Sequence, residues 1–110
     1  MTRPLRGQVF HVDMPKAGPH YWLVVSNNQR NAHFAEVLAV MITTTSPRSP
    51  RPSCVRLARQ LDPFEGWVNC DELGPVPKHK LGLVKGSLSR PTMRLVDIGL
   101  AAALSLPRPA

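Results

Sequence analysis

Two arginines in a proline-rich segment are well suited to binding phosphate. Arg48 and Arg51 lie within Ser46–Ser53, where three of the eight residues are proline. Proline lacks a backbone N–H and fixes its own φ, so we expect an exposed, semi-extended loop. Arginine forms paired hydrogen bonds with phosphate oxygens, which predicts a phosphate-binding loop, and the alternative is a solvated loop that only aids solubility. The cations that extend this predicted surface are Arg56, Lys78 and Lys80.

Aromatic side chains offer a second interaction, because nucleic-acid bases stack on aromatic rings. The candidates are Tyr21, Trp22 and Trp67, although burial in a hydrophobic core is the favoured interpretation of the two tryptophans. The four histidines and two cysteines show no spacing typical of a metal site, so we expect no metal. Cys54 and Cys70 are expected to be free, partly buried thiols.

The whole chain is small and strongly basic. Its 110 residues carry 14 Lys and Arg against 7 Asp and Glu, a formal net charge of +7. An anionic partner is therefore expected, either a nucleic acid or an acidic protein. A hydrophobic fraction of 43% argues against global disorder, and no apolar run approaches the ~20 residues of a membrane span. We expect one cytoplasmic domain over residues 1–106 and a short proline-rich tail at 107–110.

These residues must be positioned by a fold that the apolar pattern predicts to be mostly β. Tyr21–Ser26 and Glu36–Thr45 are nearly continuous apolar runs rich in β-branched residues, as in buried strands. A loop is expected over Met14–His20, because two prolines and a glycine interrupt the pattern. The expected strands are Arg6–Val12, Tyr21–Ser26, Glu36–Thr45, Cys54–Leu57 and Gly66–Asp71, with a loop through Gly74–Pro77 after the last.

A helix is expected at the carboxyl end. Ser89 is a favourable N-cap, and Pro91 suits the first turn, where its missing N–H costs little. The helix should end before Pro107, and Gly99 within it allows close packing. These elements predict an α+β, mostly β protein in which a strongly bent sheet or small barrel of five or six strands is capped by the helix. The apolar stripe of the helix is formed by Met93, Val96, Leu100 and Leu104.

Six short segments follow one another along the chain in a characteristic order: Arg6–Phe10, Trp22–Asn27, Val40–Thr44, Gly66–Asn69, Lys80–Gly82 and Leu88–Met93. This ordered set resembles the MazF/PemK family of toxin ribonucleases from bacterial toxin–antitoxin pairs. The resemblance runs from about residue 4 to residue 106, and it depends on the order of the segments rather than on any single one. It implies an SH3-like β-barrel with a C-terminal helix, a homodimer, and RNA cleavage without a metal or other cofactor. It also implies neutralisation by a MazE-like antitoxin with an acidic, disordered tail.

The resemblance also implies two catalytic positions. Thr43 matches the threonine of the family, whose hydroxyl donates to a phosphate oxygen, and the alternative is a β-favouring residue at a strand end. His20 stands where the family usually has an arginine, and a histidine can transfer a proton in both directions. The alternative interpretation is that His20 is a solvated histidine in a loop. Gly74 occupies another position where many members have arginine, which puts the RNA preference in doubt. The predicted RNA-binding residues are Tyr21, Thr44, Arg48, Arg51, Arg56, Lys78 and Lys80.

Two other functions compete with a nuclease. A CcdB-like toxin of the same fold acts on DNA gyrase through a tryptophan-containing C-terminal tripeptide, whereas this sequence finishes Leu106-Pro-Arg-Pro-Ala110. The third possibility is an SH3-like RNA- or peptide-binding module without nuclease activity. The departures from the family pattern at His20 and Gly74 make this possibility plausible.

Overall fold

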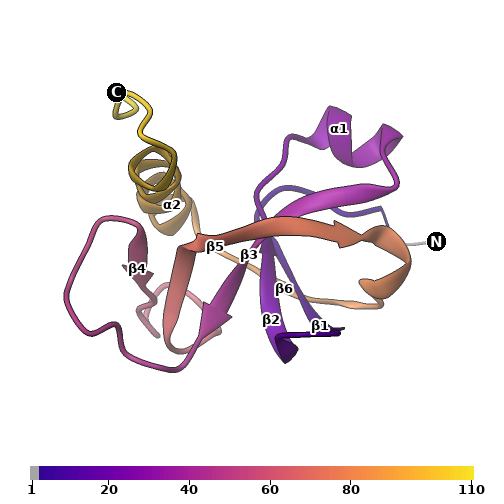
Figure 1. Ribbon diagram of the computed structural model, residues 1–110, viewed down its shortest axis with the longest axis horizontal. Helices are drawn as coiled ribbons and strands as arrows, with labels where there is room; N and C mark the ends of the chain where they lie inside the picture. Colours follow the sequence, from indigo (N-terminus) through magenta and orange to yellow (C-terminus); the bar gives the residue numbers. More distant parts are fainter. Residues whose placement is uncertain (1–2) are drawn as a thin grey trace.

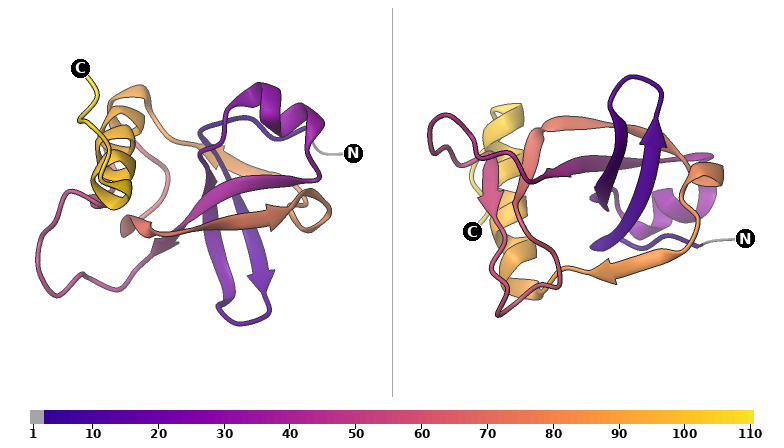
Figure 2. Two further views of the ribbon diagram at one scale, coloured as in Figure 1. Left: turned by 45° about the horizontal axis from the view of Figure 1, so that its top comes forward. Right: turned by 90° about the horizontal axis from the view of Figure 1, so that it is seen from below.

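A computed structural model describes residues 3–110 as a curled, six-stranded antiparallel sheet with a long helix beside it (Figure 1). The strand order is β4-β5-β3-β2-β1-β6, and the sheet bends into a half-barrel (Figure 2). The predicted mostly β fold with a C-terminal helix is confirmed. The elements are β1 (Gln8–Met14), β2 (Gly18–Val24), α1 (Asn28–His33), β3 (Glu36–Thr43), β4 (Cys54–Arg56), β5 (Trp67–Pro77), the 3-10 helix η1 (Lys78–Lys80), β6 (Val84–Ser87) and α2 (Arg90–Leu104).

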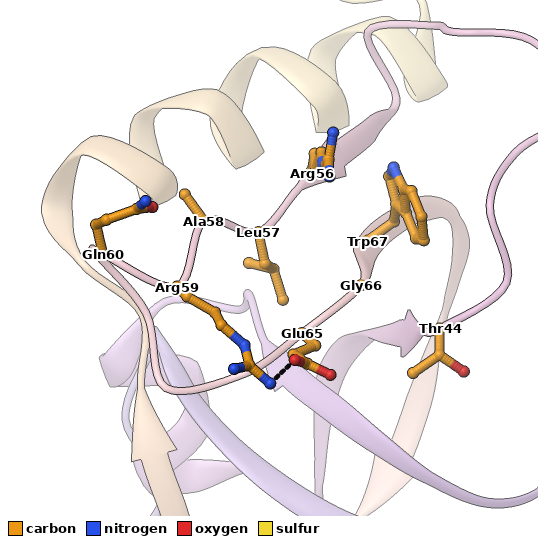
Figure 3. A pocket seen from close by; sticks show the side chains of 9 residues that line it. All are labelled: Thr44, Arg56, Leu57, Ala58, Arg59, Gln60, Glu65, Gly66 and Trp67. Atoms are coloured by element: carbon orange, nitrogen blue, oxygen red, sulfur yellow. Dashed lines mark ion pairs between the residues drawn. The ribbon is translucent and has the colours of Figure 1, made fainter.

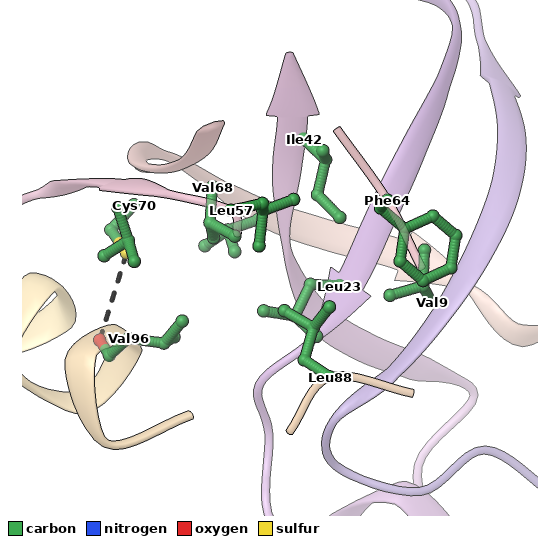
Figure 4. Packing of buried hydrophobic residues seen from close by; sticks show 11 residues of the cluster. Val9, Leu23, Ile42, Leu57, Phe64, Val68, Cys70, Leu88 and Val96 are labelled. Carbon is green, nitrogen blue, oxygen red and sulfur yellow. Dashed lines mark hydrogen bonds between the residues drawn. The ribbon is translucent and has the colours of Figure 1, made fainter. Parts of the chain in front are cut away.

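Alternation along the strands divides the hydrophobic core between the two faces of the sheet. One cluster joins the sheet to α2 and includes Leu23, Val68 and Val96 (Figure 4). The second cluster includes Phe10 and Trp22, and it lies on the opposite face because these residues alternate with those of the first cluster. Each strand residue therefore faces either α2 or the side away from it.

The first hairpin is longer than the sequence predicted. β2 begins at Gly18, where φ is +76°, and the expected loop over Met14–His20 shrinks to a tight turn. Glycine adopts this left-handed conformation without a steric penalty, and the proline beside it lies at the start of the strand, where proline is tolerated. His20 consequently lies in a strand, paired with Val12, rather than in a loop.

β5 also extends beyond its predicted end. The strand continues through Gly74–Pro77, although two of these four residues are proline. β4 pairs with β5 only from Trp67 to Asn69, and from Leu73 to Pro77 the strand pairs with β3 alone. Proline is accepted in an edge strand, because its missing N–H is not needed there. β6 was not predicted, because Val84–Ser87 shows no alternation of apolar and polar residues.

Helix α2 has the predicted start and stop. The Ser89 side chain accepts a hydrogen bond from the Thr92 backbone N–H, and the helix ends at Ser105 in the left-handed conformation. Gly99 is as closely packed as predicted, since a Cβ atom there would lie 2.9 Å from the Cys70 sulfur and 2.9 Å from the Pro52 carbonyl oxygen. No helix within residues 3–110 is long and apolar enough to cross a membrane.

Candidate active site

A row of side chains crosses the sheet on the face turned away from α2. Arg56 on β4 is opposite Trp67 on β5, which is opposite Thr43 on β3. Residues directly opposite each other in an antiparallel pair point to the same face. The pairing of β2 with β3 stops one residue before His20 and Thr43, so these two follow as the next residue on each strand. The two predicted catalytic residues therefore lie on one face, in line with an arginine and a tryptophan.

The hydrogen bond of His20 defines which ring nitrogen is available. Its Nε2 lies 2.8 Å from the Ala17 carbonyl oxygen. A carbonyl oxygen only accepts, so Nε2 must carry the hydrogen and donate it. Nδ1 of the neutral ring is then an acceptor, as a general base requires. The side chain is half-buried beside the turn of the first hairpin.

The backbone of Gly66 packs tightly against the backbone of Thr43. Thr43 Oγ1 accepts a hydrogen bond of 3.1 Å from the Thr45 backbone N–H, which leaves the hydroxyl hydrogen to donate to another group. Gly66 has a φ of +104°, and a Cβ atom there would lie 2.2 Å from the Thr43 carbonyl oxygen. Only glycine fits this approach, which sets Thr43 at the end of its strand.

Two hollows open beside Trp67, and both have Arg56 and Trp67 as walls. The larger has a volume of about 760 Å³ and follows the segment 57–66 (Figure 3); we call it the glutamine-side hollow. The smaller, with a volume of about 590 Å³, lies under the predicted phosphate-binding loop; we call it the proline-side hollow. The polar residues of the first include Thr44, Gln60 and Glu65, and the prolines of the second are Pro47, Pro50 and Pro52.

The carboxylate of Asp71 anchors the proline-rich loop to β5. Its Oδ2 atom accepts hydrogen bonds of 2.9 Å from Arg51 Nε and 2.9 Å from Ser53 Oγ. The hydrogen bond from Arg51 is the main reason that the pKa of Asp71 lies below its ordinary value. Arg51 is therefore partly neutralised within the loop, whereas Arg48 and Arg56 form no ion pair among the described residues.

Tyr21 lies on the other face of β2 from His20, because neighbouring strand residues alternate. Its ring packs against His11 at a centroid distance of 5.3 Å and against Phe64 at 5.4 Å. The side chain is 40% exposed. The structure thus does not bring Tyr21 into the row that contains Thr43.

The two predicted lysines lie at the far end of β5 from the other cations. Lys78 and Lys80 belong to η1, which follows β5, whereas Trp67 begins that strand (Figure 1). Lys78 Nζ donates a 2.6 Å hydrogen bond to the carbonyl oxygen of Asn31 in α1. Within one chain, the structure does not place these lysines with Arg48, Arg51 and Arg56.

Some residues of the site were missed by sequence reasoning. Asp71 carries no local signal of a role in the sequence, and only its hydrogen bond with Arg51, 20 residues away, shows that it anchors the loop. Gln60 and Glu65 lie in a segment without hydrophobic periodicity, so no local pattern marks them as pocket residues. Glu65 also forms an ion pair with Arg59 across this segment (Figure 3). Among residues 3–110, no group of three or more His, Cys, Asp or Glu side chains is arranged to hold a metal ion.

Several proteins that are similar to this chain in both sequence and fold are endoribonucleases. The chain is 43% identical over 109 residues to Endoribonuclease MazF4 of Mycobacterium tuberculosis and, equally, to Endoribonuclease MazF1 of Mycobacterium bovis, covering 99% of this chain and 100% of each relative. A solved endoribonuclease from a mycobacterial species superimposes with a TM-score of 0.87 at 42% identity, covering 99% of this chain and 98% of that one.

A second solved mycobacterial endoribonuclease, in complex with its cognate antitoxin, has a TM-score of 0.86 at 43% identity and covers 96% of this chain and 99% of that one. Residues 5–104 match the family described as PemK-like, MazF-like toxin of type II toxin-antitoxin system. The resemblance of the short segments is thereby confirmed along nearly the whole length. The chain belongs to the PemK-like, MazF-like family of toxins of type II toxin–antitoxin systems.

Proposed function

We propose that this endoribonuclease toxin cleaves RNA without a metal, through attack of the substrate's own 2′-hydroxyl on the adjacent phosphorus atom. A bond forms between the 2′-oxygen and phosphorus, and the bond from phosphorus to the 5′-oxygen breaks. The products are a cyclic phosphate and a 5′-hydroxyl. The observation that carries the proposal is the placement of His20, Thr43 and Arg56 on one face of the sheet. The endoribonucleases at 43% identity support it.

Each of the three residues has a role in this reaction. Nδ1 of His20 accepts the proton of the 2′-hydroxyl, and the protonated ring then returns a proton to the leaving 5′-oxygen. Thr43 donates its hydroxyl hydrogen to a non-bridging phosphate oxygen. Arg56 supplies positive charge where the phosphorane gains negative charge. Arg56 on β4 is always positively charged, whereas a histidine at position 20 is charged only while it holds the extra proton. We therefore assign the stabilisation of the phosphorane charge to Arg56.

The toxin has two proposed partners, its RNA substrate and the antitoxin that inhibits it, and both are anionic. RNA binds the basic surface of the free protein, and a cognate antitoxin with an acidic, disordered tail covers it. The solved relative with its cognate antitoxin supports this partner, as does the net charge of +7. We further propose that the toxin is a homodimer and acts in the cytoplasm.

Cleavage of RNA in the presence of EDTA tests the reaction and the role of His20. Purified protein free of antitoxin is incubated with total RNA and EDTA, and 5′-hydroxyl ends are mapped. We expect discrete cuts, and a rate about 100- to 10,000-fold lower for His20→Ala, the range of a lost general acid–base group. The matched control is His79→Ala, which removes an exposed histidine of η1 and should leave the rate unchanged.

Two outcomes would contradict this proposal in different ways. Intact RNA together with inhibition of DNA gyrase would show that the toxin acts on the topoisomerase. Full cleavage by His20→Ala would show that another group takes the 2′ proton, and the Thr43→Ala variant would then test whether the same face is used at all.

A further inference from the structure

Trp67 is the common wall of two hollows with different linings. The residue is half-buried and starts β5, and it is not among the residues of either core cluster. We propose that the two hollows hold the bases of two successive nucleotides of single-stranded RNA, one on each side of Trp67. We further propose that the glutamine-side hollow selects its base and the proline-side hollow does not. This inference rests on the proposed function, because it names how the same surface reads its RNA.

The dimensions of the hollows suit nucleotides. Their volumes of about 760 and 590 Å³ lie within the roughly 300–1,000 Å³ of small-molecule pockets. They meet only at Arg56 and Trp67, which are opposite each other on β4 and β5. A base in either hollow can contact the indole, and the phosphate that joins the two nucleotides then lies at the boundary, where Arg56 provides the cation. Trp67 thus contacts both bases, and Arg56 binds the phosphate between them.

The glutamine-side hollow contains groups that can distinguish one base edge from another. The Gln60 amide offers both a donor and an acceptor, and the Thr44 hydroxyl can act as either. The Glu65 carboxylate accepts hydrogen bonds only, and it forms an exposed ion pair with Arg59. A polar set of this kind rejects a base with the wrong edge, because its own groups would then remain unpaired.

The proline-side hollow has no side-chain amide or carboxylate among its lining residues, and its one hydroxyl, that of Ser46, donates to the Pro47 carbonyl oxygen at 3.5 Å. Three prolines line it, and proline has no side-chain polar group and no backbone N–H. Arg51, which also lines it, has its Nε atom occupied by Asp71. The Cys54 thiol is a weak hydrogen-bonding group. Bases of any kind can therefore pack between prolines and Trp67, because stacking does not depend on the base edge.

The fluorescence of Trp67 tests the occupancy without any cleavage. The probe is single-stranded DNA of random sequence, which lacks the 2′-hydroxyl and is not cut by the proposed reaction. We expect the DNA to quench tryptophan emission, and we expect Trp67→Phe to lose most of the quenching, since the other tryptophan, Trp22, is buried. Absence of quenching would overturn the proposal. So would quenching by an acidic polyglutamate peptide but not by DNA, which would assign the hollows to an acidic protein segment.

A pool of random RNA tests which hollow selects. Sequencing the 5′-hydroxyl ends gives the preference at every position around the cut. We expect Gln60→Ala to relax the preference at one position and to leave its neighbour unchanged, whereas Pro50→Ala relaxes none. Trp67→Leu should lower kcat/KM about 10- to 100-fold, as expected for loss of base stacking. The matched controls are Gln29→Ala and Phe34→Leu, an exposed glutamine and an exposed aromatic residue of the α1 region, which should change nothing.

The outcomes separate this inference from the proposed function. Normal cleavage and normal base preference in Trp67→Leu and Gln60→Ala would overturn the inference and leave the nuclease proposal standing. Quenching that depends on Trp67 without any cleavage of RNA would support the two subsites and overturn the nuclease proposal. A loss of preference in Pro50→Ala equal to that in Gln60→Ala would overturn the assignment of selectivity to one hollow.

Discussion

The two cysteines are close in the sheet but have different surroundings. Cys54 is opposite Asn69, the residue before Cys70, so the two thiols point to opposite faces. Burial raises the pKa of Cys70 to about 12, and its sulfur lies 3.9 Å from the Val96 carbonyl oxygen of α2, to which it donates. Burial also raises the pKa of Cys54, to which the negative charge of Asp71 contributes. Neither thiol is therefore a nucleophile at neutral pH.

The raised pKa of Cys70 predicts a loss of stability in alkali. Above the ordinary thiol pKa of 9.0, the unfolded chain releases this proton while the folded chain keeps it until about pH 12. The folded state then binds more protons, so the free energy of unfolding decreases as pH rises from about 9 to 12. Urea unfolding at several pH values measures the effect. The decrease should be smaller in Cys70→Ala, and an identical pH dependence in both proteins would contradict the assignment.

At the scale of elements, the anchoring of the proline-rich loop matters most for the site. The loop joins β3 to β4 and covers the proline-side hollow, and Asp71 on β5 holds it through Arg51 and Ser53. Both partners of the ion pair are about 40% exposed, so water screens their attraction and the pair contributes little to global stability. Its effect is local: it fixes the prolines over the hollow.

Removing this anchor should expose the loop to protease. We expect trypsin to cut after Arg48 about 2- to 5-fold faster in Asp71→Ala, a small effect because the lost ion pair is exposed and screened by water. The matched control is Glu72→Ala, an exposed carboxylate next along β5. Mass spectrometry of timed digests measures the rate. Because Arg51 lowers the pKa of Asp71, the anchor should persist at pH 5 and disappear only below the ordinary value of 3.8. Equal digestion of both variants would show that the loop is held by other contacts.

At the scale of the whole molecule, the predicted RNA-binding cations are divided between two ends. The proline-rich loop and β4 carry Arg48, Arg51 and Arg56, whereas η1 carries the lysines at the opposite end of β5 (Figure 2). The sequence alone suggested that these arginines and lysines form one continuous basic surface. In the structure, the length of β5 separates the arginines from the lysines. RNA short enough to occupy one site should therefore contact the arginine end only.

Salt dependence of RNA binding measures this division. Each phosphate contact with a single strand contributes about −0.7 to the slope of log affinity against log salt concentration, so three arginines predict a slope of about −2. Arg48→Ala should reduce the magnitude of the slope by about 0.7, and Lys80→Ala should leave it unchanged. Binding of a short, non-cleavable oligonucleotide by fluorescence anisotropy provides the data. A lower slope in Lys80→Ala would place η1 at the RNA surface, as the sequence suggested.

Local patterns predicted the elements better than the site. Ser89 and Pro91 mark the start of α2, and the β-branched runs mark β2 and β3, because these signals lie within a few residues of the element. The row of Arg56, Trp67 and Thr43 depends on the register of strands distant in sequence, which no local pattern contains. His20 and Thr43 were predicted only through the resemblance to a family. The two hollows are formed by connecting segments, whose course depends on tertiary contacts such as those of Asp71.

The short strand β4 has a consequence for the behaviour of the protein at high concentration. It forms one edge of the sheet with three residues, directly after the proline-rich loop. The unpaired N–H and C=O groups of a long edge are a template on which another chain can add as a strand and aggregate. A three-residue edge after several prolines offers too few of these groups for such growth. The prolines beside Trp67 thereby also oppose the addition of another chain at the β4 edge of the sheet.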